Sequence, residues 1–425
     1  MLPGASGTVW TNISRPVEIP EWVRAAAKTN EVRIAKLISS DRSVSVDTIA
    51  SVDWRSLCDF GSGNPQIKID WTLIEFVQLA DLMHKGGLFH TETSGLFDRG
   101  FGSAVFIKYT PSESVMIGEM HRLLCWKAVQ KDNHNAVRFF YNRFMDYCAS
   151  DQEAIHSYIG ALEDEMPTSR GIVDFLIQHE FAHFCRNHPE CLSEKGARQG
   201  GSYEIPFDKI DKNFVDHVGR HKLSYEHFVD LFTKPENKDL AEEVYCDAIG
   251  ALHMLDFQFD NEELLSPEAV RNLLAYVQVV HTVGWITALE CALFDDDTES
   301  RVGDFRRIVL MQNVRSHFGT NYTFFSLMLT AILDGDDVVE ALVETAAAAM
   351  SFMDWLDHTF AHFLEQVISW RFELRDLGAS SFWQADEIDT VIDHLRRYPN
   401  FDRVDYETAK RISAVLPRGW TVTKD

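Results

Sequence analysis

Positive charge and long apolar runs are both scarce in this sequence. Of its 425 residues, 40 are Lys or Arg and 65 are Asp or Glu, which gives a formal net charge of −25. A surface that binds nucleic acid needs Lys and Arg to face the phosphates, so this balance argues against a nucleic-acid partner. No run of 18 apolar residues occurs, and we therefore expect no membrane-spanning helix and no membrane partner.

Two further features are missing, and both concern the compartment. The first twenty residues contain neither a positively charged segment nor the apolar stretch of a signal peptide. The seven cysteines have no paired spacing, which is typical of reduced thiols rather than of a disulfide framework. These observations predict a cytoplasmic protein.

Helical periodicity dominates what is present. The sequence predicts a predominantly α protein with a small β-sheet (α+β), in which residues 66–71, "QIKIDW", alternate like a strand. We divide the chain into a mixed α/β region (1–114), a helical core (115–295) and a C-terminal helical region (301–425).

One predicted helix in the middle of the chain has clear end signals. Thr168 or Ser169 can cap its start, and Pro189 stops it. This helix contains the short motif "HEFAH", which makes it the segment on which a functional interpretation depends.

The motif places two histidines one helical turn apart. His179 and His183 share a helix face, with a rise of about 6 Å between them, so their imidazoles can bind one Zn²⁺. Glu180 follows the first histidine and can reach a water molecule in an open coordination position, where it serves as general base. The motif therefore predicts a catalytic zinc ion.

The third ligand is expected downstream, in "LAEEVYCDAIGAL". Glu243 and Asp247 lie four residues apart and share a helix face. Glu243 would complete a His₂Glu site, and Asp247 would accept a hydrogen bond from a ligand histidine and set its tautomer. Glu242 is a competitor for the third position. His188, at the predicted helix end, fits a C-terminal cap better than a ligand.

Together, these two segments resemble those of the gluzincin metallopeptidases. "HEFAHFCRNH" and the later "EEVYCD" are similar to the HExxH-x4-H and ExxAD elements of the Lit-type phage-exclusion peptidases. Cys246 stands where that pattern usually has alanine, and Asn187 where it commonly has glycine. The resemblance covers roughly residues 60–255. It implies that residues 115–295 form a zincin-like catalytic core, in which a helix with HExxH lies beside a later helix with a glutamate. It further implies a soluble zinc endopeptidase that cleaves a cellular protein, used in phage defence, with zinc on His179, His183 and Glu243.

Other histidines leave alternatives open. His281 is a candidate donor to the oxyanion of the tetrahedral intermediate, although a buried structural histidine fits the same pattern. His358 and His362 repeat the spacing of the motif on a long amphipathic helix, where packing is the stronger interpretation.

Two other functions compete with the peptidase. The first is a carboxylate-bridged diiron protein, because Glu153 and His156 form a second ExxH pair. The second is a non-catalytic helical binding or effector protein with a structural metal site. For a cytosolic protease we also expect an activator or inhibitory partner that restrains it.

Overall fold

The computed structural model describes a framework of helices with one small sheet. It covers residues 19–49, 56–59, 64–86, 120–125, 127–128, 133, 136–137, 139–141, 168–197, 238–255, 266–294 and 336–376. The acidic segment 295–300, which we predict to separate the core from the C-terminal region, lies outside the described residues.

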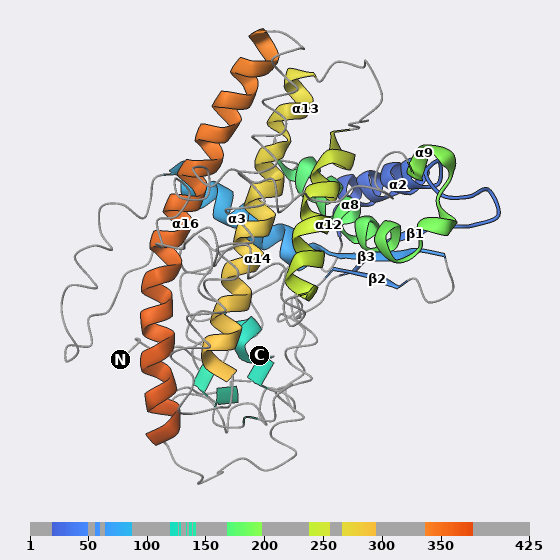
Figure 1. Cartoon of the computed structure of the whole chain (residues 1–425). Helices are drawn as coiled ribbons and strands as arrows, with labels where there is room; N and C mark the ends of the chain where they lie inside the picture. The colour runs from blue at the N-terminus through green and yellow to red at the C-terminus, as the bar shows by residue number, and fades with distance from the viewer. Residues whose placement is uncertain are drawn as a thin grey trace, which may run out of the picture.

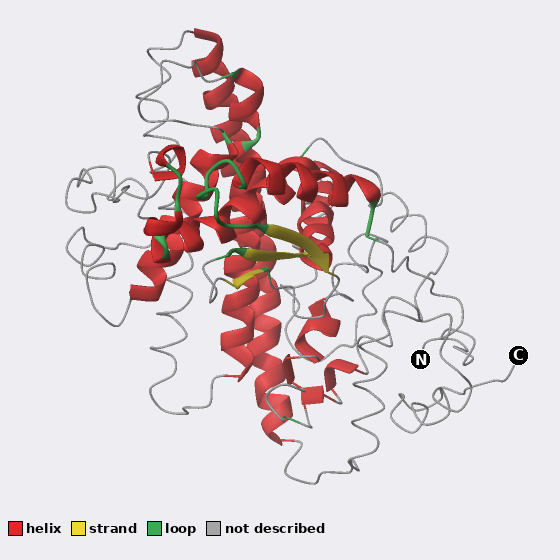
Figure 2. Cartoon of the chain, turned by 90° about the vertical axis from the view of Figure 1, so that its right-hand side faces the viewer, coloured by secondary structure: helices red, strands yellow, loops and turns green. Residues whose placement is uncertain are grey.

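The elements confirm a mainly helical chain with a small sheet, and thus the α+β class (Figures 1 and 2). The long helices are α2 (Glu21–Ile34), α3 (Trp71–Gly86), α8 (Ser169–Asn187), α12 (Lys238–Met254), α14 (Leu273–Phe294) and α16 (Asp336–Asp376). Shorter elements are the 3₁₀ turn Pro189–Cys191, α9 (Glu194–Gly196) and α13 (Pro267–Arg271). The strands are β1 (Ser45–Ile49), β2 (Leu57–Asp59) and β3 (Gln66–Asp70).

The sheet is mixed, and β3 is its central strand. β1 pairs with β3 in parallel, with Val46 opposite Ile67, and β2 pairs with β3 antiparallel, with Cys58 also opposite Ile67. The alternating pattern of "QIKIDW" correctly predicted a strand. For a peptidase, the sequence also makes this segment a candidate for the strand that pairs with an extended substrate. That prediction is wrong, because β3 is already hydrogen-bonded on both sides, to β1 and to β2.

Helix α8 lies at the centre of the described framework. It contacts α12, α14, α2, α3, β2 and β3. Its end at Asn187 agrees with the predicted stop at Pro189. The predicted side-chain cap at its start is wrong: Thr168 donates its hydroxyl to Asp81 Oδ2 at 3.1 Å, and the Ser169 hydroxyl accepts a hydrogen bond from Gln78.

Buried polar side chains join α8 to its neighbours. Asp81 of α3, only 1% exposed, accepts hydrogen bonds from Thr168 and from Gln278 of α14. On another side of α8, Asn30 of α2 donates to Asp174 at 2.6 Å and accepts from Gln178 at 2.8 Å. Because buried polar groups are costly without partners, these bonds favour one relative placement of the four helices.

Helix α16 packs along α14 for much of its length (Figure 1). The apolar pattern of residues 266–293 predicts one long helix, but the structure divides this segment into α13 and α14, with a break at Asn272. Ser266 caps the first of them by accepting a hydrogen bond from the Ala269 amide at 3.1 Å. Among the described helices, none is long and apolar enough to cross a membrane.

Candidate metal centre

The candidate site lies where α8 and α12 pack backbone to backbone. Gly250 of α12 makes this contact possible: a Cβ at that position would lie 2.9 Å from both the Cα and the N of His179. Gly250 is three residues after Asp247 and seven after Glu243, and so lies on the same helix face. The missing side chain lets this face of α12 approach the histidines of α8. We did not single out this glycine from the sequence, although its place on the ligand face was a usable signal.

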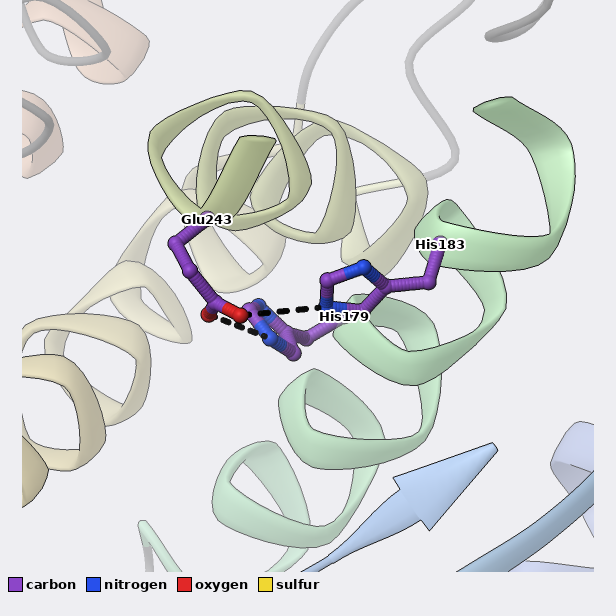
Figure 3. A group of neighbouring side chains, drawn as sticks. All are labelled: His179, His183 and Glu243. Atoms are coloured by element: carbon purple, nitrogen blue, oxygen red, sulfur yellow. Dashed lines mark ion pairs between the residues drawn. The ribbon is translucent and has the colours of Figure 1, made fainter. Parts of the chain in front are cut away.

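Three side chains converge in the gap between the two helices. Glu243 Oε2 lies 3.5 Å from His179 Nε2, and Glu243 Oε1 lies 3.6 Å from His183 Nε2. Figure 3 shows the carboxylate reaching toward both rings. The imidazole planes are inclined at 80°, with their centroids 5.1 Å apart. One potential ligand atom from each residue lies within 4.8 Å of the others.

The three side chains are placed so that they could bind one zinc ion. With Zn–N and Zn–O bonds of about 2.0–2.2 Å, the ligand atoms of a tetrahedral site are about 3.3–3.6 Å apart. The Glu243 carboxylate lies at such a distance from each histidine through a different oxygen, 3.5 Å from Oε2 to His179 and 3.6 Å from Oε1 to His183. Two imidazole nitrogens and one carboxylate are also the donor types that zinc takes in catalytic sites. The Glu243 side chain is 36% exposed and that of His179 10%, so the group is reachable from solvent on the glutamate side.

Asp247 lies behind the first histidine. Its Oδ1 is 2.9 Å from His179 Nδ1, and its side chain is fully buried. Burial by itself lowers the pKa of His179, but the hydrogen bonds and negative charges of Asp247 and Glu243 outweigh burial and raise it to about 10. Since Nδ1 faces Asp247, Nε2 is the nitrogen directed toward Glu243.

Glu242 lies behind the second histidine, a position that the sequence did not suggest. Its Oε1 is 3.1 Å from His183 Nδ1 and accepts a hydrogen bond from Asn187 Nδ2 at 3.3 Å. In the sequence Glu242 competed with Glu243 for the third ligand position. In the structure Glu243 faces the two Nε2 atoms, whereas Glu242 faces the far nitrogen of His183.

Glu180 lies toward the sheet. It is partly buried on α8, and its negative charge acts on the Cys58 thiol of β2. Burial and then the charge of Glu180 are the two largest causes that raise the pKa of this thiol to about 12. Helix α8 contacts β2, and Glu180 thus lies on α8 near Cys58 of this strand, one of the two edge strands of the described sheet.

His281 lies on α14, outside the His179–His183–Glu243 group. Its Nε2 is 2.7 Å from Asp357 Oδ1 of α16, which also accepts the indole N–H of Trp285 at 2.8 Å. The side chain of His281 is 1% exposed. This contact provides a structural role, and the oxyanion role stays a prediction.

The remaining histidines lie in other surroundings. His188 is the C-terminal cap residue of α8, and its Nδ1 lies 3.2 Å from Glu190 Oε1. His358 and His362 belong to helix α16, but their side chains are outside the described part of the structure. The ExxH pair Glu153 and His156 also lies outside the described residues.

Comparisons of the chain with protein-family models, with curated proteins and with solved structures find no match. The resemblance to gluzincins thus rests on the two short motifs alone.

Proposed function

We propose that this chain is a zinc-dependent endopeptidase that hydrolyses a peptide bond in a cytosolic protein. The observation that carries the proposal is the convergence of His179, His183 and Glu243, with 3.5 and 3.6 Å between the carboxylate oxygens and the Nε2 atoms. Each histidine also has a carboxylate behind its far nitrogen. Metal-ligating histidines in proteins are commonly oriented in this way.

The residues of the site divide the work. His179, His183 and Glu243 would hold a zinc ion, which when bound would supply Lewis acidity and lower the pKa of water to about 7. Glu180 accepts the proton of the attacking water and delivers it to the leaving amine. Asp247 keeps the proton of His179 on Nδ1, so that Nε2 remains a ligand.

The outer edge of β2 is the strand edge that we propose for the substrate. Both sides of β3 are paired, whereas β2 ends the three-stranded order β1-β3-β2 of the described sheet. An extended peptide can add to such an edge through main-chain hydrogen bonds. Cys58, in the middle of β2, lies within the electrostatic reach of Glu180, so a peptide bound there lies beside the proposed base.

The two competing functions make different demands on the site. A structural zinc site is closed by four protein ligands, but three protein groups converge among the described residues, and one of them is 36% exposed. A diiron site would need further bridging glutamates together with Glu180.

Metal content and hydrolysis are the decisive measurements. The purified chain should contain about one zinc per molecule by mass spectrometry, and Glu243→Ala should lose it. Glu180→Gln should keep the zinc but lose cleavage of a mixed peptide library, whereas the control Glu344→Gln, on the exposed surface of α16, should keep both. Two irons per chain would favour the diiron protein, and zinc without cleavage would favour a structural site.

Restraint of the protease is a separate part of the proposal. A cytosolic peptidase with an open cleft would be toxic, so we propose that a partner or a lid limits access, as expected of an enzyme used in phage defence. The wild-type chain alone should then cleave short peptides but leave unfolded casein largely intact. Rapid degradation of casein would contradict restraint without contradicting the peptidase.

A further inference from the structure

The described part of the site contains two more carboxylates than a His₂Glu zinc centre with a general base requires. Beyond Glu180 and Glu243, Asp247 lies at the far nitrogen of His179, and the Glu242 carboxylate lies 3.1 Å from the far nitrogen of His183. Two side chains of α8, His183 and Asn187, contact this carboxylate and fix its position.

We propose that Glu242 is a positioning residue that holds His183 in the metal-binding orientation, and that Asn187 locks Glu242 in place. This inference rests on the proposed function, because it concerns the same metal. Glu242 contacts neither the metal nor the substrate in this assignment and acts only through His183.

The first support is the direction of the ring. His183 Nδ1 faces Glu242 at 3.1 Å, and Nε2 of the same ring faces Glu243 at 3.6 Å. A carboxylate can only accept a hydrogen bond from the ring, so it keeps the proton of a neutral imidazole on Nδ1. The lone pair is then on Nε2, where a metal shared with Glu243 would bind it.

The second support is the contact with Asn187. This side chain lies one helical turn after His183 and donates from Nδ2 both to the His183 carbonyl, at 2.8 Å, and to Glu242 Oε1, at 3.3 Å. It therefore connects the backbone that carries His183 with the carboxylate that orients the His183 ring. A small residue at position 187 would lack this amide.

The adjacent residues Glu242 and Glu243 of α12 approach different nitrogens of His183. Successive helical residues point about 100° apart, so Glu242 and Glu243 cannot both face the same atoms. Glu243 points between the two rings, as Figure 3 shows, and Glu242 reaches the outer side of His183. Asp247 has the corresponding relation to His179, at 2.9 Å.

Exposure sets the size of the expected effect. The Glu242 side chain is 32% exposed, whereas that of Asp247 is fully buried. When a metal-ligating histidine loses the residue that hydrogen-bonds its other ring nitrogen, metal affinity falls by roughly 10- to 100-fold. Water can partly replace such a residue where it is exposed. We therefore expect about a tenfold loss of zinc affinity for Glu242→Gln, and a larger loss for Glu242→Ala, within the same range.

The test measures zinc affinity by competition with a chelator, independently of any cleavage. Full-length wild type, Glu242→Gln, Glu242→Ala, Asn187→Ala and the double variant of the last two are compared, with Glu344→Gln as the control glutamate on the exposed face of α16. Because Asn187 acts through Glu242, adding Asn187→Ala to Glu242→Ala should cause little further loss. Proton NMR of the zinc forms should show that the hydrogen-bonded Nδ1–H signal of His183 is lost in Glu242→Ala.

The possible outcomes separate this inference from the proposed function. Wild-type zinc affinity in both Glu242 variants, or a loss of the same size in Glu344→Gln, would overturn the positioning role and leave the peptidase intact. Weaker zinc binding in Glu242→Gln beside a wild type that cleaves no peptide would support the positioning role and refute the peptidase. A wild type that takes up no zinc would overturn both.

Discussion

Replacement of Gly250 by alanine tests the packing on which the candidate site depends. A Cβ at this position would lie 2.9 Å from the Cα and the N of His179, whereas ordinary contacts begin at 3.4 Å. The Cβ would thus be about 0.5 Å too close. Its neighbours are backbone atoms of α8, so no side-chain rotation can relieve the contact, and α12 must move away from α8.

The expected loss of stability follows from two opposing effects. Overpacking of a tight contact costs about 1–3 kcal/mol, and alanine in a helix interior is favoured over glycine by about 1 kcal/mol. We expect a net loss of about 1 kcal/mol in the free energy of unfolding without metal. The metal site is more sensitive: plausible zinc–ligand distances hold within about 0.2 Å, and a 0.5 Å displacement of Glu243 exceeds this, so zinc affinity should fall at least tenfold.

Urea unfolding in the presence of a chelator, followed by zinc titration of the folded protein, measures the two effects separately. Gly250→Ser, with one more atom, should be affected at least as strongly as Gly250→Ala. A Gly250→Ala protein that is more stable than wild type, as helix propensity alone predicts, and that binds zinc normally would refute the close approach of α12 to α8.

Three further predictions follow from other contacts. Glu180→Gln should raise the alkylation rate of Cys58 severalfold at alkaline pH. Burial and the charge of Glu180 hold the pKa of this thiol at about 12, and loss of the charge lowers it. If peptide mapping of the alkylated protein showed an unchanged rate, Glu180 would lie away from β2. Asp81→Ala should lower the free energy of unfolding by about 3 kcal/mol in urea, because it leaves the buried Gln278 amide without its acceptor; a loss below about 1 kcal/mol would contradict this. For His281→Gln, the predicted oxyanion role requires a fall in kcat of about 100-fold with unchanged zinc content; a normal kcat with a lower Tm would assign His281 to its contact with α16 alone.

The helix of the "HEFAH" motif and its ligand spacing are visible in the sequence because they are local. Residues four apart on a helix share a face whatever surrounds them, so His179 and His183 could be paired without a structure, and so could Glu243 and Asp247. The end of α8 before Pro189 is local for the same reason.

Predictions that depended on a neighbour in space were less successful. Thr168 has the chemistry of a helix cap, but its hydroxyl donates to Asp81, which is 87 residues away in the chain. The strand at 66–71 was recognisable by its alternation, yet its central place depends on which strands pair with it. Asp81 and the strands that pair with β3 lie outside the local sequence pattern, so the pattern could not predict the role of Thr168 or the central place of β3.

The sequence by itself determined which residue types can hold a metal here and at what spacing on each of two helices. Only the tertiary structure decided that Glu243 faces both Nε2 atoms while its neighbour Glu242 faces the far side of His183. That division depends on how α12 is rotated and how closely it approaches α8, which the absent side chain of Gly250 permits. Helical periodicity sets directions within one helix, but the relative placement of two helices comes from the packing of residues about sixty positions apart in the chain.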